Sequence, residues 1–115
     1  MTRVKRGIVT KKRHKRLLKK SKGYWGQRKN IFKRAKETVM RAMAYAFEGR
    51  KNRKRDMRGL FISRINAAAE THGLSYNNFM FGLKKANVGL NRKILSQLSI
   101  YDPKVFAELA DIAKG

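Results

Sequence analysis

Two dense runs of lysine and arginine are the residues of this chain whose types and spacing most clearly suggest a chemistry. One run lies within residues 11–22 and the other within residues 50–58, and Asp56 is the only acid in either. On a helix, the six cations of the second run sweep an arc of about 200°, so they repel one another unless anions line both flanks. A solvated helix surface normally intersperses acids, so the two runs predict binding to a nucleic acid. The runs comprise Lys11, Lys12, Arg13, Lys15, Arg16, Lys19, Lys20 and Lys22, then Arg50, Lys51, Arg53, Lys54, Arg55 and Arg58.

An aromatic pair separates the first basic run from the next. Tyr24 and Trp25 stand between Gly23 and Gly26, an arrangement that lets the rings stack on unpaired bases or riboses while the backbone approaches phosphate. This favours RNA over DNA. The alternative is that Trp25 packs against the helix that follows, and both interpretations stay open at this point. A nucleoid-type DNA-binding protein would also show the same charge.

The residue types that support catalysis or metal binding are sparse and scattered. The chain has no cysteine, and its two histidines, His14 and His72, are 58 positions apart. We expect His14 to contact RNA and His72 to stand at a helix C-terminus, where a cation or a donor is favourable. Glu108 and Asp111 fit the solvent face of a final helix. With no paired carboxylates, activated nucleophile or phosphate-binding glycine loop, the sequence predicts no enzyme, no cofactor and no metal site.

The charge is distributed unevenly along the chain. Its 115 residues include 30 Lys and Arg against 7 Asp and Glu, a net charge of +23. Residues 1–60 hold 23 basic and 3 acidic side chains, whereas residues 61–115 hold 7 and 4. We therefore predict a basic helical extension that binds a polyanion over residues 1–58 and a small globular helical domain over residues 59–115. The longest apolar run is Ala42–Phe47, so we expect neither a signal peptide nor a membrane span.

The elements that carry the basic extension should be helices, and the predicted fold class is all-α. A first helix is expected from a Thr10 cap to about Lys22, ending at Gly23. From Gln27 onward, apolar residues recur at helical spacing and predict an amphipathic helix. The sequence leaves open whether this helix ends at Gly49 or Gly59 or continues through both toward Ala69. Its seam consists of Ile31, Phe32, Ala35, Val39, Ala42, Met43 and Ala46.

The second half reads as a small helical core. His72–Gly73 marks a helix end, and Ser75, Asn91 and Asp102–Pro103 predict the starts of three short helices. The apolar sets of these helices are Phe79, Met80 and Leu83, then Ile94, Leu95 and Leu98, then Val105, Phe106, Leu109 and Ile112. Four further cations flank the turn at residues 87–90, where they could converge on one phosphate-rich site. They are Lys84, Lys85, Arg92 and Lys93.

Several motifs, spread over nearly the whole chain, resemble one known family. They are Arg3-Val4-Lys5-Arg6-Gly7, Lys22-Gly23-Tyr24-Trp25-Gly26, Arg53-Lys54-Arg55-Asp56, Ser63-Arg64-Ile65-Asn66-Ala67-Ala68 with Gly73 and Ser75-Tyr76, and Leu90-Asn91-Arg92-Lys93-Ile94-Leu95. Together they resemble ribosomal protein twenty of the bacterial large subunit, a family also present in plastids. Two departures are Phe61, where the family usually has tryptophan, and Glu70, where it has a basic or neutral polar residue.

The resemblance implies a structural, non-enzymatic protein. Its N-terminal arm would thread into large-subunit ribosomal RNA, and its C-terminal domain would sit on an RNA junction beside neighbouring large-subunit proteins. Family members act early in subunit assembly, and some repress translation of their own message. The residues that match RNA-facing stretches are Lys5, Arg6, the run from Lys11 to Lys20, the run from Arg50 to Arg58, Arg64 and Asn66.

The remaining expected RNA contacts are Arg3, His14, Tyr24, Trp25, Arg28 and the four cations around the 87–90 turn. We expect no homo-oligomer, no membrane partner and no small-molecule substrate, and a location on the ribosome in the cytoplasm, or in the stroma if plastid-encoded. Two rivals from other classes are a DNA-compacting protein and a membrane-active cationic peptide. The second would need a broad apolar face, whereas the first helix offers only Leu17 and Leu18.

Overall fold

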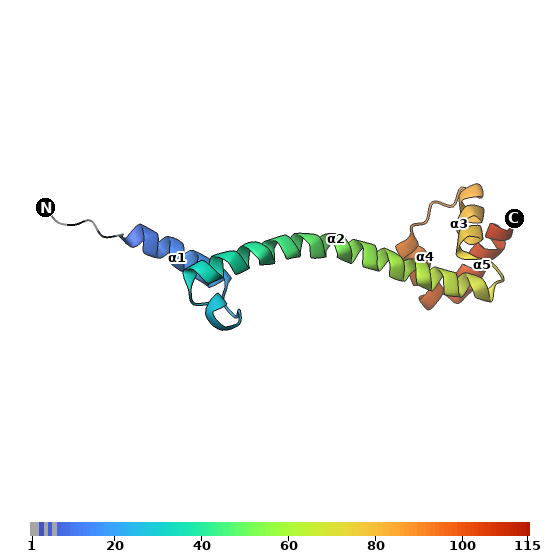
Figure 1. The fold of residues 1–115 in the computed structure, drawn as a ribbon. Coiled ribbons are helices and arrows are strands. Elements are labelled where there is room, and N and C mark those ends of the chain that lie inside the picture. The colour runs from blue at the N-terminus through green and yellow to red at the C-terminus, as the bar shows by residue number, and fades with distance from the viewer. Residues whose placement is uncertain (1–2, 4, 6) are drawn as a thin grey trace. The chain divides into compact units, whose positions relative to one another are not determined.

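The computed structural model describes residues 3, 5 and 7–115, and over that part of the chain it contains helices and no strand. The predicted all-α class is therefore confirmed. The elements, labelled in Figure 1 apart from the short η1, are α1 (Ile8–Lys20), η1, a 3₁₀ turn (Gly26–Arg28), α2 (Phe32–Thr71), α3 (Tyr76–Lys85), α4 (Arg92–Tyr101) and α5 (Pro103–Lys114). No helix among the described residues is long and apolar enough to cross a membrane.

The chain divides into two compact units, with the boundary between Lys51 and Asn52. Helix α2 contributes to both units and passes Gly49 and Gly59 without interruption. Single glycines within a helix cost only about 1 kcal/mol each, which the rest of a 40-residue helix tolerates. The predicted division after residue 58 lies further along α2 and stays a prediction.

In the first unit, α1 packs through one narrow face. Thr10, His14 and Leu17 are half-buried and Ser21 is fully buried, and their spacing of three or four residues puts them on the same side of the helix. The His14 ring stacks on Phe32 at the start of α2, with ring centroids 3.8 Å apart. Helix α1 therefore does pack within its unit, although it buries none of its own residues completely.

The segment between α1 and α2 turns at two glycines. Gly23 (φ +86°) and Gly26 (φ +56°) adopt the left-handed region that glycine tolerates best. Ser21 ties this segment to the end of α1, because its Oγ lies 3.0 Å from the Leu18 carbonyl oxygen and 3.3 Å from that of Lys29. The turn at Gly26–Arg28 delays the start of α2 to Phe32, so the prediction of a helix from Gln27 was wrong by five residues.

Two further details of the first unit differ from expectation. Thr10 does not cap α1: the helix begins at Ile8 after Gly7, whose carbonyl oxygen accepts from the Thr10 amide at 3.2 Å. The apolar seam of α2 is also shorter than predicted. Ala35 and Val39 are buried and Ala42 is half-buried, but residues 43–60 are exposed throughout.

The second unit is built around one apolar core. Its buried members come from the end of α2 and from α3, α4 and α5, which gather around that end of α2 in Figure 1. The rings of Phe79 and Phe106 stack with centroids 5.1 Å apart, and α3 meets α5 so closely that a Cβ on Gly82 would lie 2.7 Å from the Ala113 Cα. The core comprises Ile65, Ala69, Phe79, Leu83, Leu95, Phe106, Leu109 and Ala110.

Local signals fix the helix ends in this unit. The side chains of Ser75 and Asn91 accept the amides of Asn78 (3.3 Å) and Ile94 (2.9 Å), as N-caps do. Asp102 and Pro103 occupy the expected positions at the start of α5, but Asp102 makes no side-chain cap hydrogen bond. Helix α2 ends as predicted at His72–Gly73, where Gly73 (φ +74°) closes a Schellman motif through its own amide and that of Leu74.

Candidate nucleic-acid interface

The cations of α1 form a stripe on the side away from its packing face. Lys12, Lys15, Arg16 and Lys19 recur at helical spacing and, with Leu18, line a shallow cavity of about 520 Å³. Lys11, Arg13 and Lys20 are exposed on the flanks of the stripe. The one aromatic group of this helix, His14, instead has its ring stacked on Phe32, so the expected RNA contact would have to use its remaining surface.

The second basic run lies on the part of α2 whose residues are all exposed. All six cations from Arg50 to Arg58 are exposed. Two make weak local contacts: Lys51 Nζ lies 4.7 Å from the centroid of the Phe47 ring, and Arg55 Nη1 donates to Asn52 Oδ1 at 3.1 Å. Because most helix stability in proteins comes from packing, this bare stretch gains little from the rest of the chain.

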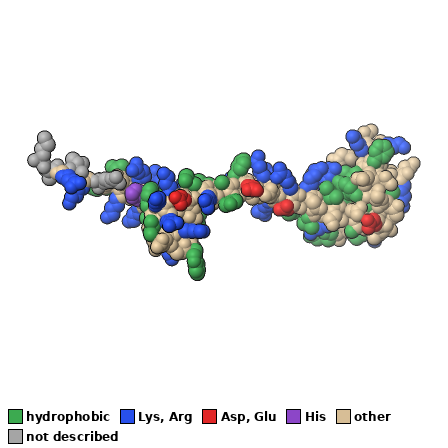
Figure 2. Space-filling view, viewed as in Figure 1, with side chains coloured by type: hydrophobic (Ala, Val, Ile, Leu, Met, Phe, Trp, Pro, Cys, Tyr) green, Lys and Arg blue, Asp and Glu red, His purple; other side chains and the backbone are tan. Residues whose placement is uncertain are grey.

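Carboxylates do not neutralise these cations within the molecule. Among the described residues there is one ion pair, Lys114 Nζ to Asp111 Oδ1 at 3.5 Å, near the end of α5. Glu37, Glu48 and Asp56 lie on α2 among many cations, but none of them makes an ion pair within 4 Å to a cation that the structure describes. Figure 2 shows the resulting surface, on which lysine and arginine greatly outnumber acids. Such a surface is complementary to a polyanion.

The aromatic pair lies outside the apolar core. Trp25 is 90% exposed, so it is not buried against α2. Tyr24 is half-buried, and both rings line a cavity of about 610 Å³ together with Arg28 and residues of α2. Sequence reasoning named Tyr24, Trp25 and Arg28 but missed the α2 members Arg34, Arg41 and Tyr45, because they join the cavity only through the turn at residues 21–31.

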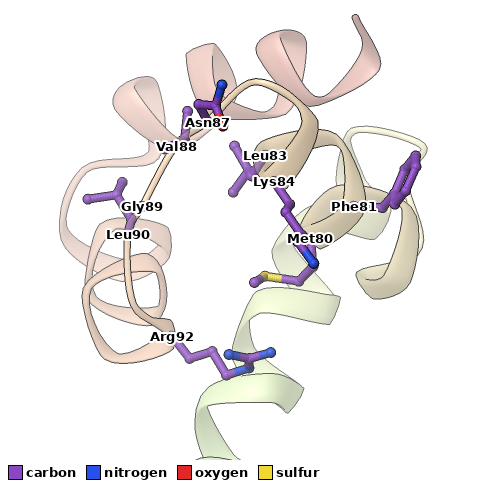
Figure 3. A pocket seen from close by; sticks show the side chains of 9 residues that line it. All are labelled: Met80, Phe81, Leu83, Lys84, Asn87, Val88, Gly89, Leu90 and Arg92. Carbon is purple, nitrogen blue, oxygen red and sulfur yellow. The ribbon is translucent and has the colours of Figure 1, made fainter.

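In the second unit, the structure brings together two of the four cations around the 87–90 turn. Lys84 and Arg92 line a cavity of about 530 Å³ whose walls are Met80 and Leu83 on one side and Val88 and Leu90 on the other (Figure 3). Lys85 lines a different cavity, and Lys93 is exposed and lines neither. Arg92 Nε donates to the Tyr76 hydroxyl at 2.7 Å, which fixes the guanidinium at one end of the first cavity.

Asn66 and Arg64 occupy different environments. Arg64 is exposed. Asn66 is half-buried; its Oδ1 accepts the Tyr76 amide at 3.1 Å, and its Nδ2 donates to Glu70 Oε1 at 2.8 Å. Asn66 thus anchors the start of α3 against α2, and Glu70, one of the two departures from the family pattern, is its partner. The bond between Asn66 and Tyr76 had no sequence signal, since it depends on the turn after α2, whereas Asn66 and Glu70 are four residues apart on one helix.

The remaining predicted residues lie at the N-terminus. Arg3 and Lys5 are exposed, and Arg6 lies outside the described residues. The part of the chain that the structure describes holds no group of three or more His, Cys, Asp and Glu side chains that could bind a metal ion.

Taken together, the fold and the cation-rich surface define a strongly basic, all-helical protein with a small core and long exposed basic helices. Residues 3–109 match the family described as ribosomal protein L20. The chain is 55% identical to the large ribosomal subunit protein bL20 of Caldanaerobacter subterraneus over 99% of its length and 96% of that protein, and 53% identical to that of Finegoldia magna over 100% and 98%. The bL20 protein of Clostridium novyi is 54% identical over 99% and 96%.

The chain therefore belongs to the ribosomal protein L20 family, as its motifs indicated. This is a family of structural proteins of the large ribosomal subunit and not of enzymes.

Proposed function

We propose that the chain binds large-subunit ribosomal RNA directly and supports early assembly of the large subunit in the cytoplasm. The observation that carries the proposal is the set of exposed cations on α1 and α2 that have no carboxylate partner among the described residues. Its bacterial relatives, all named as large-subunit proteins, support the ribosome as its location and favour the cytoplasm over the plastid stroma.

The mechanism follows from the charge. Phosphates of several RNA segments would be neutralised by Lys and Arg of the first unit, which lets those segments approach where their own charge keeps them apart. Release of condensed counterions supplies much of the affinity. The second unit would choose the site, because it carries the fixed guanidinium of Arg92 beside Lys84 on a folded core. An arm–domain division near residue 58 belongs to this proposal.

The same surface would serve self-repression, if the message of this protein presents an RNA that mimics the ribosomal site. Neighbouring large-subunit proteins are expected as further partners, and a homo-oligomer is not.

The proposal is tested by fractionating ribosomes from cells that express a tagged chain. The chain should sediment with the large subunit after a high-salt wash that removes loosely associated proteins, and it should already be present in incomplete large-subunit particles. Recovery in the unbound fraction, or with bulk DNA, would overturn the proposal.

A further inference from the structure

The aromatic cavity of the first unit combines features that phosphate binding alone does not need. Its α2 wall consists of positions three or four residues apart, from Arg34 to Tyr45, so they share one face of the helix. The opposite wall comes from the turn between α1 and α2. The lining residues are Tyr24, Trp25, Arg28, Arg34, Glu37, Thr38, Arg41, Ala42 and Tyr45.

Two of the rings in this cavity are left uncovered by the protein. Trp25 is 90% exposed and Tyr45 is 69% exposed. Exposed aromatic rings in a cationic cavity are the usual platform for unpaired bases, because every base has a π-face and a phosphate beside it.

Three guanidinium groups supply the charge for such a ligand. Arg28, Arg34 and Arg41 are exposed, line the cavity and make no ion pair with any described residue. Each guanidinium is planar and presents its donors in the fork that matches phosphate. A nucleotide could therefore place its base on the rings and its phosphates on the arginines.

Glu37 is the residue that limits which base the cavity would accept. It lies three residues after Arg34 and four before Arg41, yet within the described part of the chain its carboxylate makes no ion pair within 4 Å. A carboxylate repels phosphate, so Glu37 disfavours a phosphate in its own part of the cavity, whereas it can accept hydrogen bonds from a base there. An ionised carboxylate has two acceptor oxygens. Among the four RNA bases, only guanine offers two adjacent donors, N1–H and N2–H, on its Watson–Crick edge.

We propose that this cavity binds one unpaired guanine nucleotide of the RNA, with the base on Trp25 and Tyr45 and its Watson–Crick edge toward Glu37. The inference rests on the proposed function, which supplies the RNA. It adds a base-specific site to a unit whose other contacts would be to phosphate.

The chain carries its own reporter, since Trp25 is its only tryptophan. We would titrate the full-length protein with single-stranded RNA pentamers of the sequences UUGUU, UUAUU, UUCUU and UUUUU and follow Trp25 fluorescence. These carry the same phosphate charge, so any difference reflects the central base. Quenching should saturate with UUGUU at a concentration at least about fivefold lower than with the others, since a good two-hydrogen-bond pair typically discriminates at that level.

Matched variants separate the base from the phosphates. Glu37→Gln should reduce the guanine preference to within about twofold, whereas Glu48→Gln, which removes the same charge from an exposed site of α2 outside the cavity, should leave it unchanged. Tyr45→Ala should weaken all four pentamers about fivefold or more, because a stacking surface is lost. Tyr101→Ala, at a 79% exposed tyrosine of the second unit, is its control.

Both test positions are exposed, so the variants should keep the helical content of the parent, which circular dichroism checks. Equal affinities for the four pentamers, absence of quenching, or equal effects of Glu37→Gln and Glu48→Gln would overturn the guanine site.

A parallel titration with a structured fragment of large-subunit ribosomal RNA distinguishes the two proposals. If the parent protein binds the fragment but does not discriminate the pentamers, only the guanine site fails. If it does not bind the fragment, the proposed function fails.

Discussion

Removing the hydroxyl of Tyr76 should weaken RNA binding by the second unit without dismantling its fold. This hydroxyl accepts a 2.7 Å hydrogen bond from Arg92 Nε, and both side chains are half-buried. Tyr76→Phe keeps the ring and its packing but releases the guanidinium at one end of the cavity that it shares with Lys84. The variant therefore isolates how much the fixed position of one cation contributes to RNA affinity.

The expected sizes follow from this geometry. A hydrogen bond to a charged group contributes about 1.5–3 kcal/mol when fully buried. Because water can replace the lost hydroxyl at a half-buried site, we expect a loss of about 1 kcal/mol in the free energy of unfolding. Ordering a freed, rotamer-rich side chain on binding costs about 0.5–1.5 kcal/mol, which weakens RNA binding by about two- to tenfold.

The assay is filter binding of the full chain to a structured fragment of large-subunit ribosomal RNA, with urea unfolding measured in parallel. Tyr101→Phe removes the same hydroxyl from a tyrosine that is 79% exposed and has no hydrogen-bond partner among the described residues, so it serves as the control. If the two variants bind the fragment equally well, the fixed Arg92 guanidinium contributes nothing to recognition, and the reasoning is refuted.

Two substitutions test the packing of the second unit by urea unfolding. Gly82→Ala should lower the free energy of unfolding by about 2 kcal/mol, since the new Cβ meets the Ala113 backbone where α3 approaches α5. The control is Gly89→Ala, which has open space around it and should leave the free energy of unfolding unchanged. Equal stabilities of the two variants would show that the close approach is absent in solution. Ser96→Ala should raise the free energy of unfolding by about 1 kcal/mol, because the buried Ser96 Oγ has no hydrogen-bond partner among the described protein atoms. Ser99→Ala removes a hydroxyl that donates to the Ser96 carbonyl oxygen at 2.8 Å, so a gain there as large as at Ser96 would contradict this explanation.

Helix boundaries in the second unit were predictable because their signals are local. Ser75 and Asn91 accept amides three residues ahead, and Gly73 ends α2 through bonds that reach back only three to five residues. Thr10 shows the limit of such signals. A threonine at the start of a basic run resembles a cap, but the chain was already helical from Ile8.

Features that depend on tertiary contact had no sequence signal. His14 and Ser21 are polar residues in a basic run, and nothing in the run itself shows that they form the packing face of α1. The hydrogen bond between Tyr76 and Arg92 joins residues 16 positions apart, at the starts of α3 and α4.

In the candidate interface, too, local features were predictable and features that depend on tertiary contacts were not. The two cation runs followed from residue type and spacing, whereas the exposure of Trp25 was one of two interpretations that the sequence left open. By contrast, the separation of Lys85 and Lys93 from Lys84 and Arg92 depends on how α3, α4 and the loop between them pack.

The central claim is that RNA phosphates supply the counter-charge that the protein lacks, and the salt dependence of binding tests it most directly. If the exposed cations neutralise about 10 phosphates, log K for the cognate ribosomal RNA fragment should fall against log salt concentration with a slope of about −7 to −9. The measurement requires the full chain and a titration over several salt concentrations near the physiological value. A slope near −2 would mean that only a few phosphates are engaged, and would contradict the account.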